Sequence, residues 1–192
     1  MTEAVGFVVA GGRSERMGRD KALLPWAGST LLEHALVRLR AVCTDVRILA
    51  GPEARYTEYG AAVHTDLVRD AGPLGGVHAG LQNLGAGFGL FLGVDTPLIP
   101  TALLGALVAG GAGFDAVVPV VGGRPEPLCA AYRASCLGPV QRRLEAGERK
   151  MTSFWPDIRV RTMGEEELAV FGDPEEMFRN LNTPEDYVRL RG

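Results

Sequence analysis

The stretch AVGFVVAGGRSERMGRDK, from Ala4 to Lys21, decides the fold prediction for this chain. Its first part, Ala4 to Ala10, is a continuous apolar run that ends at two glycines, Gly11 and Gly12. A short apolar run of this kind is typical of a strand buried on both faces, as in a parallel sheet. The glycines and charged residues that follow indicate a loop at the carboxyl end of that strand.

Strands and helices alternate along the rest of the chain. Strands are expected at 46–50, 60–64, 89–94, 116–121, 128–132 and, as an edge strand, 159–163; helices at 30–42, 76–84, 101–108, 137–146 and from Thr183 onward. This alternation predicts an α/β fold with a mostly parallel sheet and helices on both faces. Ligands of such sheets bind beyond the carboxyl ends of the strands, so functional residues are sought there.

The composition excludes several classes of protein. With 192 residues, 46% of them hydrophobic, we expect a single domain over residues 1–192. A formal net charge of -3 provides no general attraction to nucleic acid or to a membrane surface. The three cysteines form no C-x-x-C pair, which argues against a zinc site and fits a reducing cytoplasm. We therefore expect a cytoplasmic protein with neither nucleic acid nor membrane as a partner.

The segment GGRSERMGRDK, Gly11 to Lys21, combines three glycines with four basic side chains. Glycines allow backbone N–H groups to approach a phosphate, and the basic side chains supply positive charge that Glu15 and Asp20 partly offset. Neither the P-loop nor the G-x-G-x-x-G pattern is present. The segment favours phosphate binding over the alternative of a glycine-rich turn with solvated charges.

The longer string VAGGRSERMGRDKALLPWAG, Val9 to Gly28, resembles the opening motif of a nucleotidyltransferase family that includes molybdenum cofactor guanylyltransferase. The resemblance implies a Rossmann-like, three-layer fold. It places along the nucleotide Val9, Ala10, Gly11 and Gly12, and it places Lys21 on the phosphates. A lysine there would offset the charge that accumulates on the phosphate oxygens during transfer.

A second motif, DLVRDAGPLGGVHAGL, runs from Asp66 to Leu81. Its glycines alone indicate a tight turn that enters a helix. The string is similar to a family segment in which the leading aspartate contacts the guanine nucleotide, which implies this role for Asp66. Carboxylate oxygens suit guanine because they accept from its N1–H and its exocyclic amine. We expect His78 to be a structural or surface residue.

A third motif, FLGVDTPLIP, places Asp95 at the end of a buried strand. Burying a carboxylate at that position costs free energy unless a cation pairs with it. Mg2+ beside a triphosphate is a natural partner. The alternative is a turn or helix-cap aspartate next to a proline. The resemblance favours the metal ligand, because the family carries its metal-binding aspartate at the corresponding strand end. Lys21 and Asp95 are thus the predicted catalytic residues.

Two later strings complete the resemblance. EPLCAAY, Glu126 to Tyr132, is similar to a family strand near the second substrate, and NLNTPED matches an element that implies Asn180 and Asn182 at the active site. Without the resemblance, NLNTPED reads as a helix entry. Arg149 and Lys150 are candidates for binding an anionic second substrate, with a solvated helix end as an equally good interpretation.

The resemblance implies transfer of GMP from GTP to the terminal phosphate of molybdenum-molybdopterin, with Mg2+ and release of pyrophosphate. Client molybdoenzymes or their chaperones are the expected protein partners. A cytidylyltransferase, another transferase for a small phosphorylated acceptor, and a non-catalytic nucleotide-binding module that delivers the cofactor remain alternatives. Family members often carry an asparagine after the second strand, where this chain has Gly51. That departure bears on the choice of base more than on the chemistry.

Overall fold

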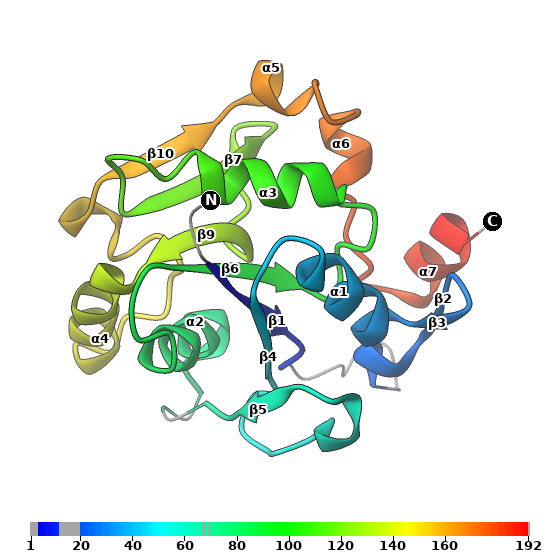
Figure 1. The fold of residues 1–192 in the computed structure, drawn as a ribbon, viewed down its shortest axis with the longest axis horizontal. Helices are drawn as coiled ribbons and strands as arrows, with labels where there is room; N and C mark the ends of the chain where they lie inside the picture. Colours follow the sequence, from blue (N-terminus) through cyan, green and yellow to red (C-terminus); the bar gives the residue numbers. More distant parts are fainter. Residues whose placement is uncertain (1–3, 12–19, 67, 69, 192) are drawn as a thin grey trace.

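A mixed eight-stranded sheet forms the centre of the computed structural model, which describes residues 4–11, 20–66, 68 and 70–191 (Figure 1). Its strands are β1 (Ala4–Val9), β4 (Asp45–Leu49), β5 (Ala62–His64), β6 (Phe88–Gly93), β7 (Ala116–Val121), β8 (Arg124–Pro125), β9 (Cys129–Arg133) and β10 (Val160–Met163). The order is β10-β7-β9-β6-β1-β4-β5, with β8 paired to β7, and a separate hairpin joins β2 (Pro25–Trp26) to β3 (Ser29–Thr30).

The prediction of a mostly parallel sheet is confirmed. Strand β1 pairs in parallel with both β4 and β6, β4 with β5, and β7 with β10. Strand β9 lies antiparallel between β6 and β7, and the two-residue strand β8 is antiparallel to β7. A strand that reverses direction in the middle of the sheet was not predicted, since an apolar run carries no information on its direction.

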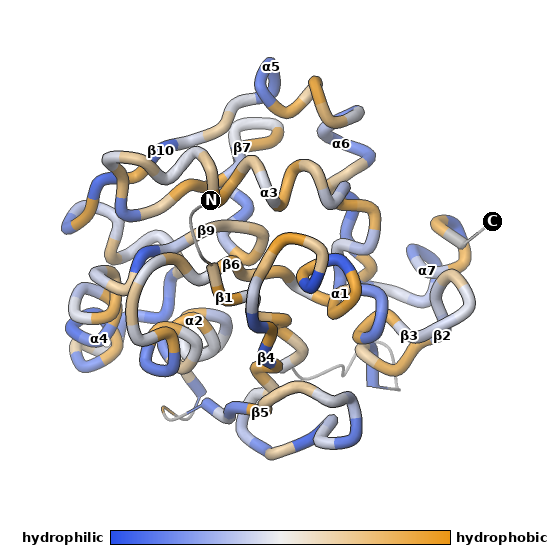
Figure 2. The backbone as a smooth tube through the Cα atoms, in the orientation of Figure 1, coloured by the Kyte–Doolittle hydropathy of each residue, from blue (hydrophilic) through white to orange (hydrophobic). Residues whose placement is uncertain are grey.

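Helices cover both faces of the sheet (Figure 1). They are α1 (Leu31–Arg40), α2 (Gly72–Gln82), α3 (Thr101–Ala109), α4 (Leu137–Glu145), α5 (Glu165–Leu168), α6 (Pro174–Met177) and α7 (Pro184–Arg191). One hydrophobic cluster contains side chains of α1 and α3, and the other contains side chains of α2 and α4. Figure 2 accordingly shows the central strands β1 and β6 in hydrophobic colours. None of the helices in the described residues is long and apolar enough to cross a membrane.

Local capping explains where two of the helices begin. Thr30 accepts a hydrogen bond from the backbone N–H of Glu33, whose carboxylate accepts one from the backbone N–H of Thr30, so a capping box starts α1 close to the predicted start of this helix. At α7 the Thr183 hydroxyl accepts from the backbone N–H of Asp186, and Pro184 is the first helical residue, also as predicted.

The start of α2 corrects the sequence prediction. This helix begins at Gly72 and not at Gly76, so the GPLGG string forms its first turns. Pro73 stabilises this start because its fixed φ is helical and its missing N–H would have no partner there. Burial of Leu74 and Val77 offsets the poor helix propensity of the glycines.

The acidic segment from Glu165 to Asp186 has the charge pattern of a solvated face, but its apolar residues are buried. Four of its side chains are almost fully buried in the cluster that contains α1 and α3: Leu168, Met177, Phe178 and Leu181. The acidic side chains point outward between them, so the segment packs against the domain and reaches the carboxyl end of β6.

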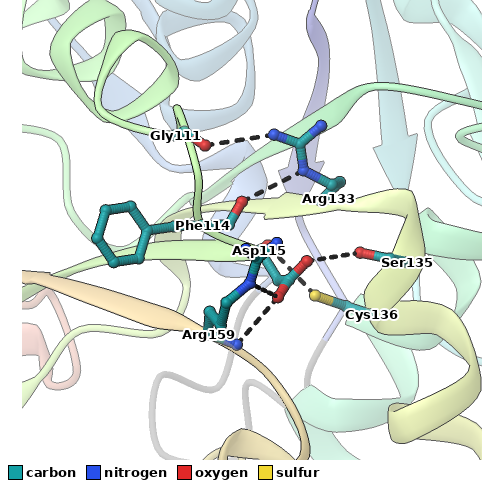
Figure 3. A network of polar contacts seen from close by, with 7 residues as sticks. All are labelled: Gly111, Phe114, Asp115, Arg133, Ser135, Cys136 and Arg159. Carbon is teal, nitrogen blue, oxygen red and sulfur yellow. Dashed lines mark hydrogen bonds and ion pairs between the residues drawn. The ribbon is translucent and has the colours of Figure 1, made fainter.

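At the opposite end of the sheet, Asp115 joins β7, β9 and β10 (Figure 3). Its carboxylate accepts from the backbone N–H of Arg159 at 3.0 Å, from the Arg159 guanidinium at 3.2 Å and from the Ser135 hydroxyl at 3.0 Å. Its carbonyl accepts from the Cys136 thiol and from the backbone N–H of Arg133. The hydrogen bonds to the carboxylate, first that from the backbone N–H of Arg159, hold the pKa of the Asp115 carboxyl below its usual value.

We expect Asp115→Asn to destabilise the fold by about 1–3 kcal/mol, because the amide group cannot accept all three hydrogen bonds. Because the pKa of Asp115 is lower in the folded than in the unfolded protein, its carboxylate stabilises the fold at pH values above the unfolded pKa. This stabilisation is lost as the pH falls through the pKa of the folded state. Urea unfolding at neutral pH and at pH values below about 4 measures this difference. Asp45→Asn, at a side chain 50% exposed, is the control, and equal stability of both variants would contradict the prediction.

Candidate active site

Three distant parts of the chain meet beyond the carboxyl ends of β1 and β6. The Lys21 Nζ donates a hydrogen bond to the Asn182 Oδ1 at 3.1 Å and lies 3.7 Å from the Asp95 Oδ2. Lys21 begins the short 3-10 helix η1 (Lys21–Leu23), Asp95 follows β6, and Asn182 precedes α7. The structure thus brings together one residue from each of three motifs that the sequence singled out.

The backbone around Asp95 is held from several sides. Its carbonyl accepts from the backbone N–H of Leu181 at 2.8 Å, which joins the C-terminal segment to the end of β6. The next residue, Thr96, donates its hydroxyl to the carbonyl of Gly93, and the carbonyl of Pro97 accepts from the buried guanidinium of Arg38 at 2.7 Å. The Asp95 side chain is 30% exposed, so its carboxylate lies on a fixed backbone and is open to solvent.

Gly11 and Gly51 bring the ends of β1 and β4 into close contact. A Cβ atom on Gly11 would lie 2.6 Å from the backbone N of Gly51, so a side chain at Gly11 requires the backbone to move. Gly51 itself has a φ of +81°, a backbone conformation that most side chains disfavour. Asparagine tolerates this conformation better than most other residues. The tight approach gives a physical reason for glycine at position 11.

Asp66 faces the first turns of α2. A Cβ on Gly76 would lie 3.9 Å from the Asp66 Oδ1 and 3.8 Å from a methyl carbon of Val9, so the carboxylate lies beside the start of α2 and the end of β1. The Asp66 Oδ1 is buried and has no hydrogen-bond partner among the described residues. Burial raises the pKa of the Asp66 carboxyl. A buried acceptor without a donor is suited to a ligand that supplies N–H groups.

Glu126 is an active-site candidate to which the sequence assigned no role of its own. Glu126 begins the turn that enters β9, in which the backbone N–H of Cys129 donates to its carbonyl, while β6 ends where the backbone N–H of Gly93 donates to the carbonyl of Leu128. Burial, and then the negative charge of Asp95, raise the pKa of the Glu126 carboxyl. The EPL string was visible in the sequence, but only the reversed direction of β9 brings its carboxylate to Asp95.

The remaining predicted residues have different surroundings. Asn180 is half-buried two residues before Asn182. The guanidinium of Arg149 donates to the carbonyls of Leu144 and Glu148 and so caps the C-terminal end of α4. Val9 and Ala10 are buried at the end of β1, and Gly12 lies outside the described residues.

His78 is a structural residue, as expected, and it is buried. Only 4% of it is exposed, and burial lowers the pKa of its imidazole. It lines a small pocket of about 200 Å³ between α2 and α4, together with Val68, Gln141, Leu144 and Glu145. No residue of the Lys21–Asp95–Asn182 cluster lines this pocket.

Comparisons with known proteins identify the family of this chain. Residues 6–160 match the family model described as MobA-like NTP transferase domain. A probable molybdenum cofactor guanylyltransferase of Pelotomaculum thermopropionicum is 36% identical over the whole of this chain and 93% of its own length. The molybdenum cofactor guanylyltransferase of Desulfosudis oleivorans is 32% identical over 97% of this chain and 93% of its own length.

A solved structure extends the similarity to three dimensions. Molybdopterin-guanine dinucleotide biosynthesis protein A from Archaeoglobus fulgidus superposes with a TM-score of 0.83 at 26% sequence identity, covering 97% of this chain and 96% of the other. The similarity in sequence and in fold therefore spans nearly the whole chain. The chain belongs to the MobA-like NTP transferase family and is a nucleotidyltransferase.

Proposed function

We propose that this chain, acting as one nucleotidyltransferase domain over residues 1–192, transfers GMP from GTP to the terminal phosphate of molybdenum-molybdopterin and releases pyrophosphate. The observation that carries the proposal is the convergence of Lys21, Asp95 and Asn182 at the carboxyl end of the sheet. The names of the relatives support this choice of substrates, since they are guanylyltransferases of the molybdenum cofactor.

The site suits a divalent cation held partly by a substrate. The charge of Asp95 acts on the carboxyl of Glu126, and the 3.7 Å separation between the Lys21 Nζ and the Asp95 Oδ2 is longer than a hydrogen bond. Among the described residues no group of three or more His, Cys, Asp or Glu side chains has the spacing of a complete metal site. Mg2+ typically binds one or two carboxylates and takes its other ligands from phosphate oxygens and water. When bound, it would neutralise charge on the phosphate oxygens.

The protein's own groups then position the reactants. A phosphate is a competent nucleophile at neutral pH, so attack on the α-phosphate of GTP requires no histidine or cysteine base. The ammonium of Lys21 stabilises negative charge on the phosphate oxygens as the bond to pyrophosphate breaks. Asn182 holds this ammonium through its side-chain oxygen, which directs it toward the carboxylate of Asp95. Holding both substrates in line is the larger part of the catalytic task.

Pyrophosphate release tests the reaction directly. With molybdenum-loaded molybdopterin and Mg2+ supplied, we expect turnover with GTP and none with CTP. Turnover with CTP and not with GTP would contradict the choice of GTP and identify a cytidylyltransferase. Nucleotide binding with no pyrophosphate released from either nucleotide would favour a different acceptor or the delivery module over the proposed reaction.

Asp66 is proposed to select guanine. We expect Asp66→Asn to weaken GTP binding by about 10- to 100-fold, because an amide presents donors where the carboxylate accepts from the base. Because the pKa of the free carboxyl is raised, affinity for GTP should also fall as the pH falls through that value. Calorimetric titration with GTP and with inorganic tripolyphosphate measures both effects. An equal loss for the two ligands would contradict a contact with the base.

A further inference from the structure

The residue before Lys21 is tied into a polar cluster that the proposed chemistry does not use. The Asp20 Oδ2 accepts from the hydroxyl of Tyr56 at 2.8 Å and from the Arg55 Nη1 at 3.0 Å. The Asp20 Oδ1 accepts from the same hydroxyl at 3.0 Å and from the backbone N–H of Ala22 at 3.1 Å. The sequence indicated a charge that partly offsets the basic loop, but the carboxylate is instead fully engaged in hydrogen bonds.

Tyr56 and Arg55 are held firmly enough to fix this carboxylate. Tyr56 is 4% exposed, and its backbone adopts a φ of +68°, a conformation that a bulky residue keeps only where its surroundings impose it. The Arg55 guanidinium lies 5.1 Å from the centre of the Tyr56 ring and donates to the carbonyl of Ala50 at the end of β4. The cluster therefore joins Asp20 to the central sheet.

Asp20 in turn fixes the backbone position of Lys21. Its side chain caps η1, and its carbonyl accepts from the backbone N–H of Leu23 at 3.2 Å. Ala22, on the other side of Lys21, is 1% exposed and packed in the core. With the residues before and after it anchored, the backbone of Lys21 has one position, and its side chain extends from there to Asn182.

The charge balance of the cluster is consistent with a phosphate site. A carboxylate next to a phosphate-binding lysine repels a triphosphate unless its charge is compensated. The ion pair of Asp20 with Arg55 supplies that compensation, while Lys21 forms its ion pair with Asp95. Asp20 can therefore orient the chain without removing the positive charge of Lys21.

We propose that Asp20 is a positioning residue for Lys21, and that Tyr56 and Arg55 lock its carboxylate in place. The inference rests on the proposed role of Lys21 at the phosphates of GTP. In this proposal the loop after β4, which carries Arg55 and Tyr56, positions Lys21 and does not contact the base. Tyr56 acts through Asp20 and Lys21 and not on the substrate itself.

A double-mutant cycle tests the coupling. We expect Tyr56→Phe, which retains the ring, to lower kcat/KM for GTP by about 10-fold. In a Lys21→Met background the same change should have no further effect, because the group that it positions is gone. Equal fold-losses of Tyr56→Phe in both backgrounds would overturn the proposal. Tyr59→Phe, which removes a hydroxyl from the same loop, is the control and should leave kcat/KM unchanged.

A measurement on the free protein separates this inference from the proposed function. The chain has two lysines, Lys21 and the exposed Lys150, so reductive 13C-methylation labels Lys21, one reference lysine and the α-amino group. We expect Tyr56→Phe to shift the Lys21 signal toward that of Lys150, which should not move. An unchanged Lys21 signal would overturn the positioning role even in an active enzyme. A shifted signal in a protein that releases no pyrophosphate would leave the positioning role standing and reject the proposed reaction.

Discussion

Asp95→Asn is expected to lower turnover by about 10³-fold, equivalent to roughly 4 kcal/mol of transition-state stabilisation, while the protein remains folded. The amide has the same shape but no charge, so it binds a divalent cation far less well than the carboxylate. The backbone contacts of Asp95 survive the change, since the carbonyl that accepts from Leu181 is untouched. Pyrophosphate release over a range of Mg2+ concentrations, together with thermal unfolding, measures both parts of this expectation.

A control of similar exposure is available for this variant. Asp157 has a side chain 31% exposed, against 30% for Asp95, and pairs with Arg143 away from the cluster. Asp157→Asn should leave turnover within about 2-fold of the parent, because the residue lies away from the cluster and surface ion pairs contribute little to stability. If Asp95→Asn retained the parent's rate and Mg2+ dependence, Asp95 would not be the metal ligand.

Lys21→Met is expected to lower kcat by about 10²- to 10³-fold, a loss comparable to removing one preorganised charged donor from a transition state. The methionine side chain retains much of the apolar stem of lysine, so the 17% exposed position stays filled and stability should change little. Single-turnover measurements with saturating GTP separate the chemical step from nucleotide affinity.

The matching control is Arg142→Met, which removes a positive charge from a side chain 62% exposed on α4. This variant should retain the parent's kcat and KM, since α4 contributes no residue to the Lys21–Asp95–Asn182 cluster. A Lys21→Met variant that lost affinity for GTP but kept kcat would place the lysine in ground-state binding and not in catalysis.

Local sequence patterns predicted much of the fold because they reflect interactions between near neighbours. The apolar run before Gly11 predicts a buried strand, and the Thr30 and Thr183 caps predict helix starts, each from contacts within a few residues. The helix start at Gly76 was wrong, because Pro73 and the burial of Leu74 outweigh the glycines of the first turn.

The sequence placed Asp95 and the loop that carries Lys21 after apolar strands, and the family resemblance implied Asn182. Their roles in nucleotide transfer stay predictions, as do those of Asp66, Asn180 and Arg149. What the tertiary structure decided is which of these residues meet: Lys21 and Asn182, 161 positions apart, share a hydrogen bond.

The sequence by itself determined the chemistry available at each strand end, because side-chain type and local propensity are written in the chain. Only the tertiary structure decided that β9 runs antiparallel and carries Glu126 to Asp95, and that Tyr56 reaches Asp20. Strand direction and loop-to-loop contact depend on how distant segments pack, since they are set by the burial of many side chains at once and not by any short motif.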